Sequence, residues 1–91
     1  MEIAMTAKDF LDEPPQSEVL TEYDRAHMVL YMRLLDSVAD GADWTEAVEV
    51  LFALDPDVEP DRARSVYDRH LARARWMTHT GYRHLLRLAM H

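Results

Sequence analysis

The chain has 91 residues, no cysteine and 48% hydrophobic residues, which describes one small domain and excludes both a two-domain enzyme and a disulfide-stapled secreted miniprotein. No stretch approaches the roughly 20 apolar residues of a membrane span, and residues 1–17 lack the basic and apolar regions of a signal peptide, so we expect a cytoplasmic protein. The formal net charge of −7 argues against a plain nucleic-acid binder, because such proteins are usually basic.

The beginning of the chain is expected to be a flexible tail over residues 1–19. Its segment 12–17 is acidic and contains two consecutive prolines, so it should not continue a helix. Phe10-Leu11 could instead be a short docking motif. We therefore place the folded domain at residues 20–91.

Helical signals begin at Thr21, a plausible N-cap followed by acidic residues. Gly41 is a typical helix terminator, Asp43 with Glu46 is typical of a capping box, and Pro60 suits the first turn of a further helix. The expected helices cover about 22–40, 44–54, 60–78 and 82–90. Because no segment alternates with period two, the fold class is all-α, a small three- to four-helix bundle of the homeodomain-like helix-turn-helix type.

The helix expected at 22–40 has more apolar surface than one core contact needs. The side chains on the arc facing the core are Tyr23, His27, Leu30, Tyr31, Leu34 and Val38. A second strip adjoins this arc and consists of Met28, Met32, Leu35 and Ala39. Either the last helix or Phe10-Leu11 covers the strip, or it is an adaptable surface for a partner protein.

The helix expected at 60–78 carries most of the positive charge. Residues 1–61 hold sixteen acidic groups against three basic ones (−13), whereas residues 62–91 hold seven arginines against Asp68 alone (+6). The buried stripe is expected to be Ala63, Val66, Tyr67, His70, Leu71, Ala74 and Met77. On one flank, Asp61, Arg64, Asp68 and Arg75 neutralise one another. The other flank presents Arg62, Arg69, Arg73 and Trp76 without an acidic neighbour on the helix, a pattern that could grip phosphates or an acidic protein.

Catalytic and metal sites are not indicated. His79 and His84 have neither cysteine nor an HExxH pattern nearby, so we expect no zinc. The alternating acids of 55–59 resemble a calcium loop, but Pro60 stands where that loop needs glycine. His70 and His27 are interpreted as satisfied core histidines. We expect no enzyme, no cofactor and no metal.

Several motifs resemble one family over residues 20–88. They are Met32-Arg33-Leu34-Leu35-Asp36, Asp40-Gly41-Ala42-Asp43-Trp44, Arg73-Ala74-Arg75-Trp76-Met77 and Gly81-Tyr82-Arg83-His84-Leu85-Leu86. The family is that of homeodomain-like helix-turn-helix domains on α-proteobacterial integrative and conjugative elements. Its small stand-alone members are the QseM-like antiactivators.

The resemblance implies a repressor of conjugative transfer that binds two kinds of activator, the element's excision activator and a LuxR-type quorum-sensing regulator. It implies a decoy for the activator's own related domain, with no membrane partner, no DNA contact and a monomeric state. It does not identify the interface. From the helix faces we expect the partner-binding residues to be Met28, Met32, Leu35, Asp36, Arg62, Arg69, Arg73 and Trp76.

Two other functions remain open from the residues. The chain could be a DNA-binding helix-turn-helix regulator that uses the arginine-rich third helix. It could also be a structural subunit of a mobile element, with the methionine strip as an oligomer seam.

Overall fold

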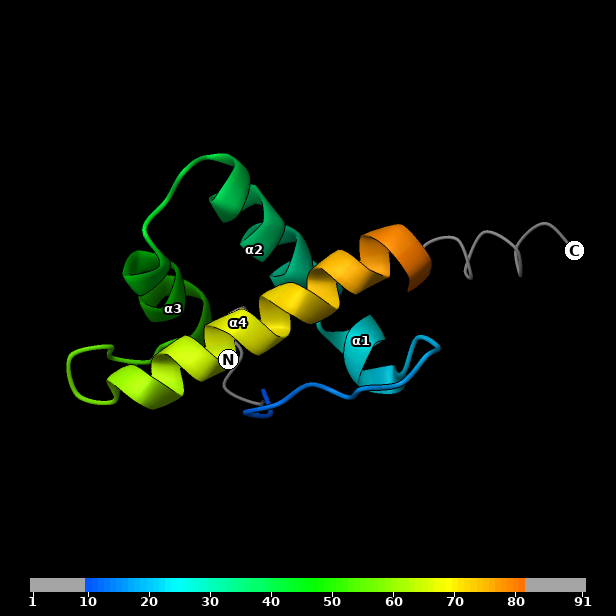
Figure 1. Cartoon of the computed structure of the whole chain (residues 1–91), viewed down its shortest axis with the longest axis horizontal. Helices are drawn as coiled ribbons and strands as arrows, with labels where there is room; N and C mark the ends of the chain where they lie inside the picture. The colour runs from blue at the N-terminus through cyan, green and yellow to red at the C-terminus, as the bar shows by residue number, and fades with distance from the viewer. Residues whose placement is uncertain (1–9, 82–91) are drawn as a thin grey trace, which may run out of the picture.

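A computed structural model describes residues 10–81 (Figure 1). The helical elements are α1 (Glu22–Ala26), α2 (Met28–Ala39), α3 (Trp44–Phe52), α4 (Pro60–Trp76) and a π-helical turn, η1 (Met77–Gly81). No strand occurs in residues 10–81, which confirms the all-α, helix-turn-helix expectation. No helix in this range is long and apolar enough to cross a bilayer. The helix expected at 82–90 lies outside the described residues.

The helix boundaries follow from local chemistry. Thr21 caps α1 through a full capping box with Asp24, and Gly41 stops α2 with a left-handed φ of 74°. Pro60 occupies the first turn of α4, where its missing N–H costs nothing. The capping box expected from Asp43 does not form, since its side chain accepts a hydrogen bond from the Thr45 hydroxyl and caps no backbone N–H.

The helix expected at 22–40 is divided at His27. The residue has φ −113° and ψ 23°, and its N–H donates to the carbonyls of Tyr23 and Asp24. Its ring stacks on the Tyr23 ring, with centroids 3.9 Å apart. The break separates the short α1 from α2, and it was not visible in the residue pattern because no glycine or proline marks it.

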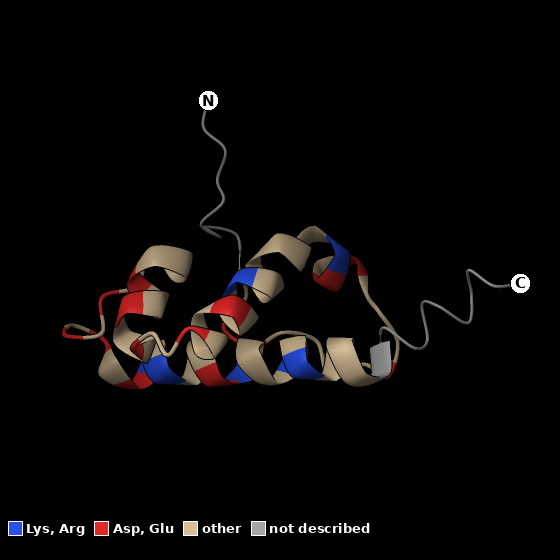
Figure 2. Cartoon of the chain, turned by 90° about the horizontal axis from the view of Figure 1, so that it is seen from above, with Lys and Arg blue, Asp and Glu red and all other residues tan. Residues whose placement is uncertain are grey.

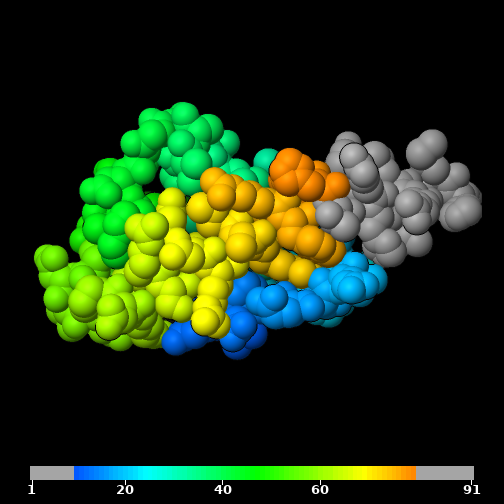
Figure 3. Space-filling view, in the orientation of Figure 1, coloured from blue at the N-terminus to red at the C-terminus, as the bar shows by residue number. Residues whose placement is uncertain are grey.

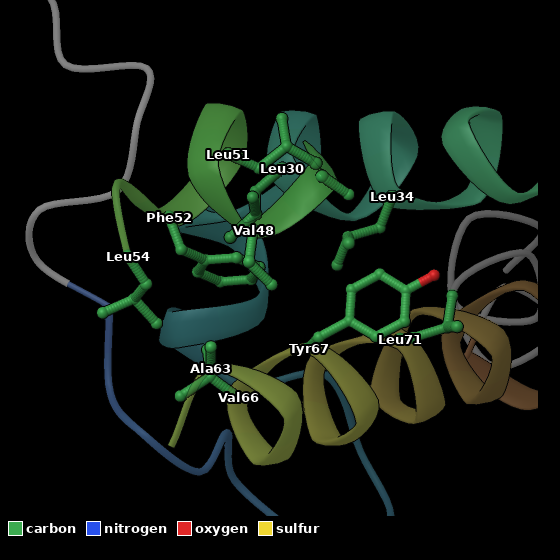
Figure 4. Packing of buried hydrophobic residues seen from close by; sticks show 11 residues of the cluster. Leu30, Leu34, Val48, Leu51, Phe52, Leu54, Ala63, Val66, Tyr67 and Leu71 are labelled. Atoms are coloured by element: carbon green, nitrogen blue, oxygen red, sulfur yellow. The ribbon is translucent and has the colours of Figure 1, made fainter. Parts of the chain in front are cut away.

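Helix α4 lies across the molecule, with α2 and α3 on one side and α1 and residues 10–20 on the other (Figure 1). The main core lies between α2, α3 and α4 (Figure 4). Its buried residues are Leu30, Leu34, Ala47, Val48, Leu51, Phe52, Leu54, Ala63, Val66, Tyr67 and Leu71. All seven residues expected on the buried stripe of α4 are buried.

Residues 10–19, here called the leader, pack against the helices. The Phe10 ring meets the Phe52 ring edge-on, with centroids 5.1 Å apart, and Pro14 is fully buried. The Leu11 N–H donates to the Tyr23 hydroxyl at 2.9 Å. The leader therefore contributes both apolar and polar contacts to the folded domain.

Candidate functional site

The predicted arginine flank of α4 faces the leader. The Arg62 guanidinium binds both carboxylate oxygens of Asp12, with its closest N–O distance 2.9 Å, and also contacts Glu59 at 3.3 Å. Arg69 forms a 2.7 Å ion pair with Glu13. The acidic partners of these two arginines thus lie outside the body of α4, because Glu59 is its N-cap residue and Asp12 and Glu13 belong to the leader.

Arg73 does not point outward as expected. Its side chain is 7% exposed and forms a 2.7 Å salt bridge with the fully buried Asp24. Its guanidinium also donates to the carbonyls of Ser17 and Val19 and stacks on the Trp76 ring, 3.9 Å from the centroid. Through these contacts the Arg73 guanidinium joins the leader, α1 and α4. Arg73 is therefore a structural residue in this fold.

Asp24 is the acceptor at the centre of this buried network. It accepts hydrogen bonds from the Arg73 guanidinium, from the Tyr31 hydroxyl at 2.8 Å and from Thr21. Burial by itself raises the pKa of the Asp24 carboxyl, but these hydrogen bonds outweigh it and lower the pKa to about 2. Asp24 is therefore ionised at neutral pH, which makes its contact with Arg73 a true ion pair.

His70 belongs to a second buried chain of hydrogen bonds. Its Nδ1–H donates to the Val66 carbonyl at 3.0 Å, so Nε2 accepts from the Tyr23 hydroxyl at 2.7 Å. The same hydroxyl accepts from the Leu11 N–H. Burial lowers the pKa of His70 to about 4, so the imidazole is neutral at pH 7. The interpretation of His70 as a satisfied core histidine is confirmed; His27 is half-buried and its Nδ1 bonds the Tyr23 carbonyl.

Acidic and basic side chains alternate along the exposed face of α4 (Figure 2). Arg64 pairs with Asp68 at 3.2 Å, which confirms the predicted neutralisation for this pair, and its guanidinium lies 4.9 Å from the centre of the Trp44 ring. The predicted neutralisation is wrong for Asp61 and Arg75, which form no salt bridge with any residue of the range 10–81. The exposed face of α4 therefore keeps an excess of positive charge on the helix itself, with Arg62, Arg64, Arg69 and Arg75 against Asp61 and Asp68.

A separate apolar groove of about 520 Å³ lies between the second helix and η1. Its lining residues are Leu20, Met28, Met32, Leu35, Asp36, Met77 and Thr78. The structure therefore brings together all four partner-binding residues predicted on the first long helix. Met32 is 57% exposed, whereas Met28 and Leu35 are half-buried against the cluster of Tyr31, Ala74 and Met77.

Sequence reasoning missed the leader residues Asp12 and Glu13 and the buried Asp24. The charge asymmetry was the available signal, because an acidic first segment and a basic last helix attract each other. The charge asymmetry does not indicate which acid pairs with which arginine, so it could not predict the positions of these carboxylates. No group of three or more metal-binding side chains occurs in the described part of the chain.

The fold is a small helical bundle whose last long helix, α4, is rich in arginine and has one exposed face. The chain belongs to the RovC DNA-binding domain family, described as "T6SS, Transcription factor, DNA binding domain", whose model matches residues 4–87. No curated protein matches the chain. The expectation of a helix-turn-helix regulator domain is thereby confirmed at the level of the family. The family description favours DNA over the expected absence of DNA contact.

Proposed function

We propose that the chain is a non-enzymatic domain of transcription regulation that contacts DNA through α4. Membership of a transcription-factor DNA-binding family over residues 4–87 carries this proposal. Helix α4 follows α3 as the second helix of a helix-turn-helix pair, and such a helix is the one that enters the major groove. Arg62 and Arg69 are 42% and 48% exposed, so both can reach phosphate oxygens at its edge.

A gel shift at low salt tests this function. The wild-type chain should shift duplex DNA, and a specific site should survive excess competitor DNA. Arg69→Glu should weaken binding, whereas Arg25→Glu, which reverses an exposed arginine on α1, is the matched control. Absence of any shift by the wild-type chain, or equal losses in the two variants, would refute contact through α4.

The second candidate is an antiactivator that sequesters transcriptional activators, namely the excision activator and the LuxR-type regulator of a conjugative element. Two observations favour it: the net charge of −7, and the pairing of all three flank arginines with acids of the same chain. An acidic domain with neutralised arginines repels DNA but leaves an apolar groove for a protein. Met28, Met32, Leu35 and Asp36 would then bind the partner, with Arg62, Arg69 and Trp76 as the competing surface.

Co-purification with the two activators tests the second candidate. If the groove binds, Met32→Asp should abolish the complex, and salt should matter little because the contact is apolar. Val50→Asp is the matched control, since Val50 has the same 57% exposure and lies outside the groove. Loss of the complex in Arg69→Glu but not in Met32→Asp would place the interface on α4 instead, and no complex with either activator would exclude this candidate.

A further inference from the structure

We infer that the leader is a built-in competitor that occupies the phosphate-contacting arginines of α4 and thereby weakens the domain's grip on DNA. This inference rests on the DNA-binding function proposed above. It concerns how that same surface is regulated, and it assigns a role to Asp12 and Glu13 that neither the family nor the residue pattern provides.

The leader is fixed to the domain on both sides of its two acids. Before them, Phe10 packs on Phe52 and the Leu11 N–H bonds to the Tyr23 hydroxyl. After them, the Arg73 guanidinium holds the carbonyls of Ser17 and Val19 at 2.6 and 3.0 Å. The leader contributes only an aromatic ring and main-chain groups to these anchors, so they hold it along α4 independently of the charges of Asp12 and Glu13 (Figure 3).

The adjacent acids between the anchors reach arginines two helical turns apart. Asp12 presents two carboxylate oxygens to the fork of Arg62, the same bidentate geometry that a phosphate would use. Glu13 covers Arg69 at 2.7 Å. Both pairs are roughly half exposed to solvent, so a phosphate can approach these guanidinium groups only in competition with a carboxylate that is already present.

The energetic consequence is a reduced number of effective phosphate contacts. Releasing two exposed ion pairs changes an equilibrium constant by about tenfold, and each phosphate contact adds about 0.9 to the slope of log affinity against log salt concentration. With both acids in place, Arg62 and Arg69 release few counterions on binding DNA. Neutralising the acids should therefore restore both affinity and salt dependence without removing the leader.

The decisive comparison uses two full-length double variants with the same change in charge. Asp12→Asn with Glu13→Gln frees the two arginines, whereas Asp40→Asn with Glu49→Gln neutralises exposed acids on the α2–α3 side. Binding to a mixed-sequence duplex is measured by fluorescence anisotropy over a salt series starting at about 50 mM. The leader variant should bind about tenfold tighter than the control variant, with a slope steeper by about one to two.

Three outcomes separate the inference from the function on which it rests. Equal affinities of the two double variants, with the wild type also binding DNA, would overturn the leader's role and leave DNA binding intact. If no form binds DNA, later elution of the leader variant than of the control from immobilised heparin would still support masking of the arginines, and co-elution would refute it. Adding Arg69→Gln to the leader variant should reduce the gain, because Arg62 alone is then free for phosphate; an undiminished gain would also overturn the inference.

Discussion

The Asp24 carboxylate and the Arg73 guanidinium meet at 2.7 Å in a salt bridge that is almost completely removed from solvent. Asp24 lies in α1 and Arg73 near the end of α4, so the pair joins the two ends of the described fold. The hydrogen bonds from Arg73 to the Ser17 and Val19 carbonyls extend the link to the leader. Arg73, which the residue pattern predicts as a binding residue, therefore stabilises the fold instead.

Removing one member of this pair should be costly. Asp24→Ala leaves the Arg73 guanidinium buried without its counter-ion, and such losses cost about 3–5 kcal/mol. Urea denaturation measures the change in the free energy of unfolding. Asp68→Ala is the control: it breaks an exposed ion pair with Arg64 and should cost no more than about 1 kcal/mol. Similar losses in the free energy of unfolding for the two variants would mean that the buried ion pair stabilises the fold no more than the exposed one does.

The Asp24–Arg73 ion pair also limits which substitutions can be used to test binding through α4. Arg73→Glu places two carboxylates together in the interior, so a loss of binding in that variant would report loss of the fold. Arg69→Glu is the suitable change on this flank, because Arg69 is 48% exposed.

Stability should fall in two separate stages as the pH is lowered. The folded pKa of His70, about 4, lies below its ordinary value of 6.5, so the unfolded chain takes up the proton first and stability decreases as pH falls from 6.5 to 4. The pKa of Asp24, about 2 against 3.8, produces a further loss as pH falls from 3.8 to 2. Each proton contributes up to about 1.4 kcal/mol per pH unit. Urea titrations of wild type and His70→Gln should differ in slope between pH 6.5 and 4; equal slopes would contradict the assignment to His70.

The Tyr23 hydroxyl connects the leader to α4 through two hydrogen bonds. Tyr23→Phe leaves the Leu11 N–H and the buried Nε2 of His70 without their partner and should cost about 1–3 kcal/mol. It should also speed hydrogen exchange of the Leu11 amide. Tyr67→Phe is the comparison, because the Tyr67 hydroxyl makes no hydrogen bond to another described residue and its loss should have a smaller effect. An unchanged exchange rate at Leu11 would show that Tyr23 does not hold the leader.

Two positions with left-handed backbone should respond in opposite directions to glycine and alanine. Ala53 ends α3 with φ 56°, a conformation that strains a Cβ, so Ala53→Gly should stabilise the domain by up to about 1 kcal/mol. Gly41 has φ 74° and open space around it, so Gly41→Ala should destabilise it by about 1 kcal/mol through backbone strain alone. Changes in melting temperature measured by circular dichroism check both signs; a loss in Ala53→Gly would contradict the strain at that position.

Local patterns were sufficient for the helices and the core. Periodicity identified the buried face of α4 from Ala63 to Met77, and Thr21, Gly41 and Pro60 marked helix ends through chemistry that depends only on neighbouring residues.

The residue pattern could not predict which side chains far apart in the sequence pair in the fold. Asp24 and Arg73 are far apart in sequence, as are Asp12 and Arg62, and only the crossing of α1 and the leader over α4 brings them together. An arginine on the edge of a helix face looks the same in sequence whether it meets water, phosphate or a carboxylate. The α2 side of the apolar groove was easier to anticipate, since Met28, Met32, Leu35 and Asp36 lie on one helix and share one face.

Phe10 is part of the folded core, although the domain was expected to begin at residue 20. Its ring closes over Phe52 and lies 6.2 Å from the His70 ring, beneath the guanidinium of Arg62. A chain shortened to residue 20 would open this side of the interior to water and lose the buried Pro14 as well. Residues 10–19, which the residue pattern assigns to a tail, cover this side of the core, so transplanting the helices alone into another polypeptide would transfer an incomplete core.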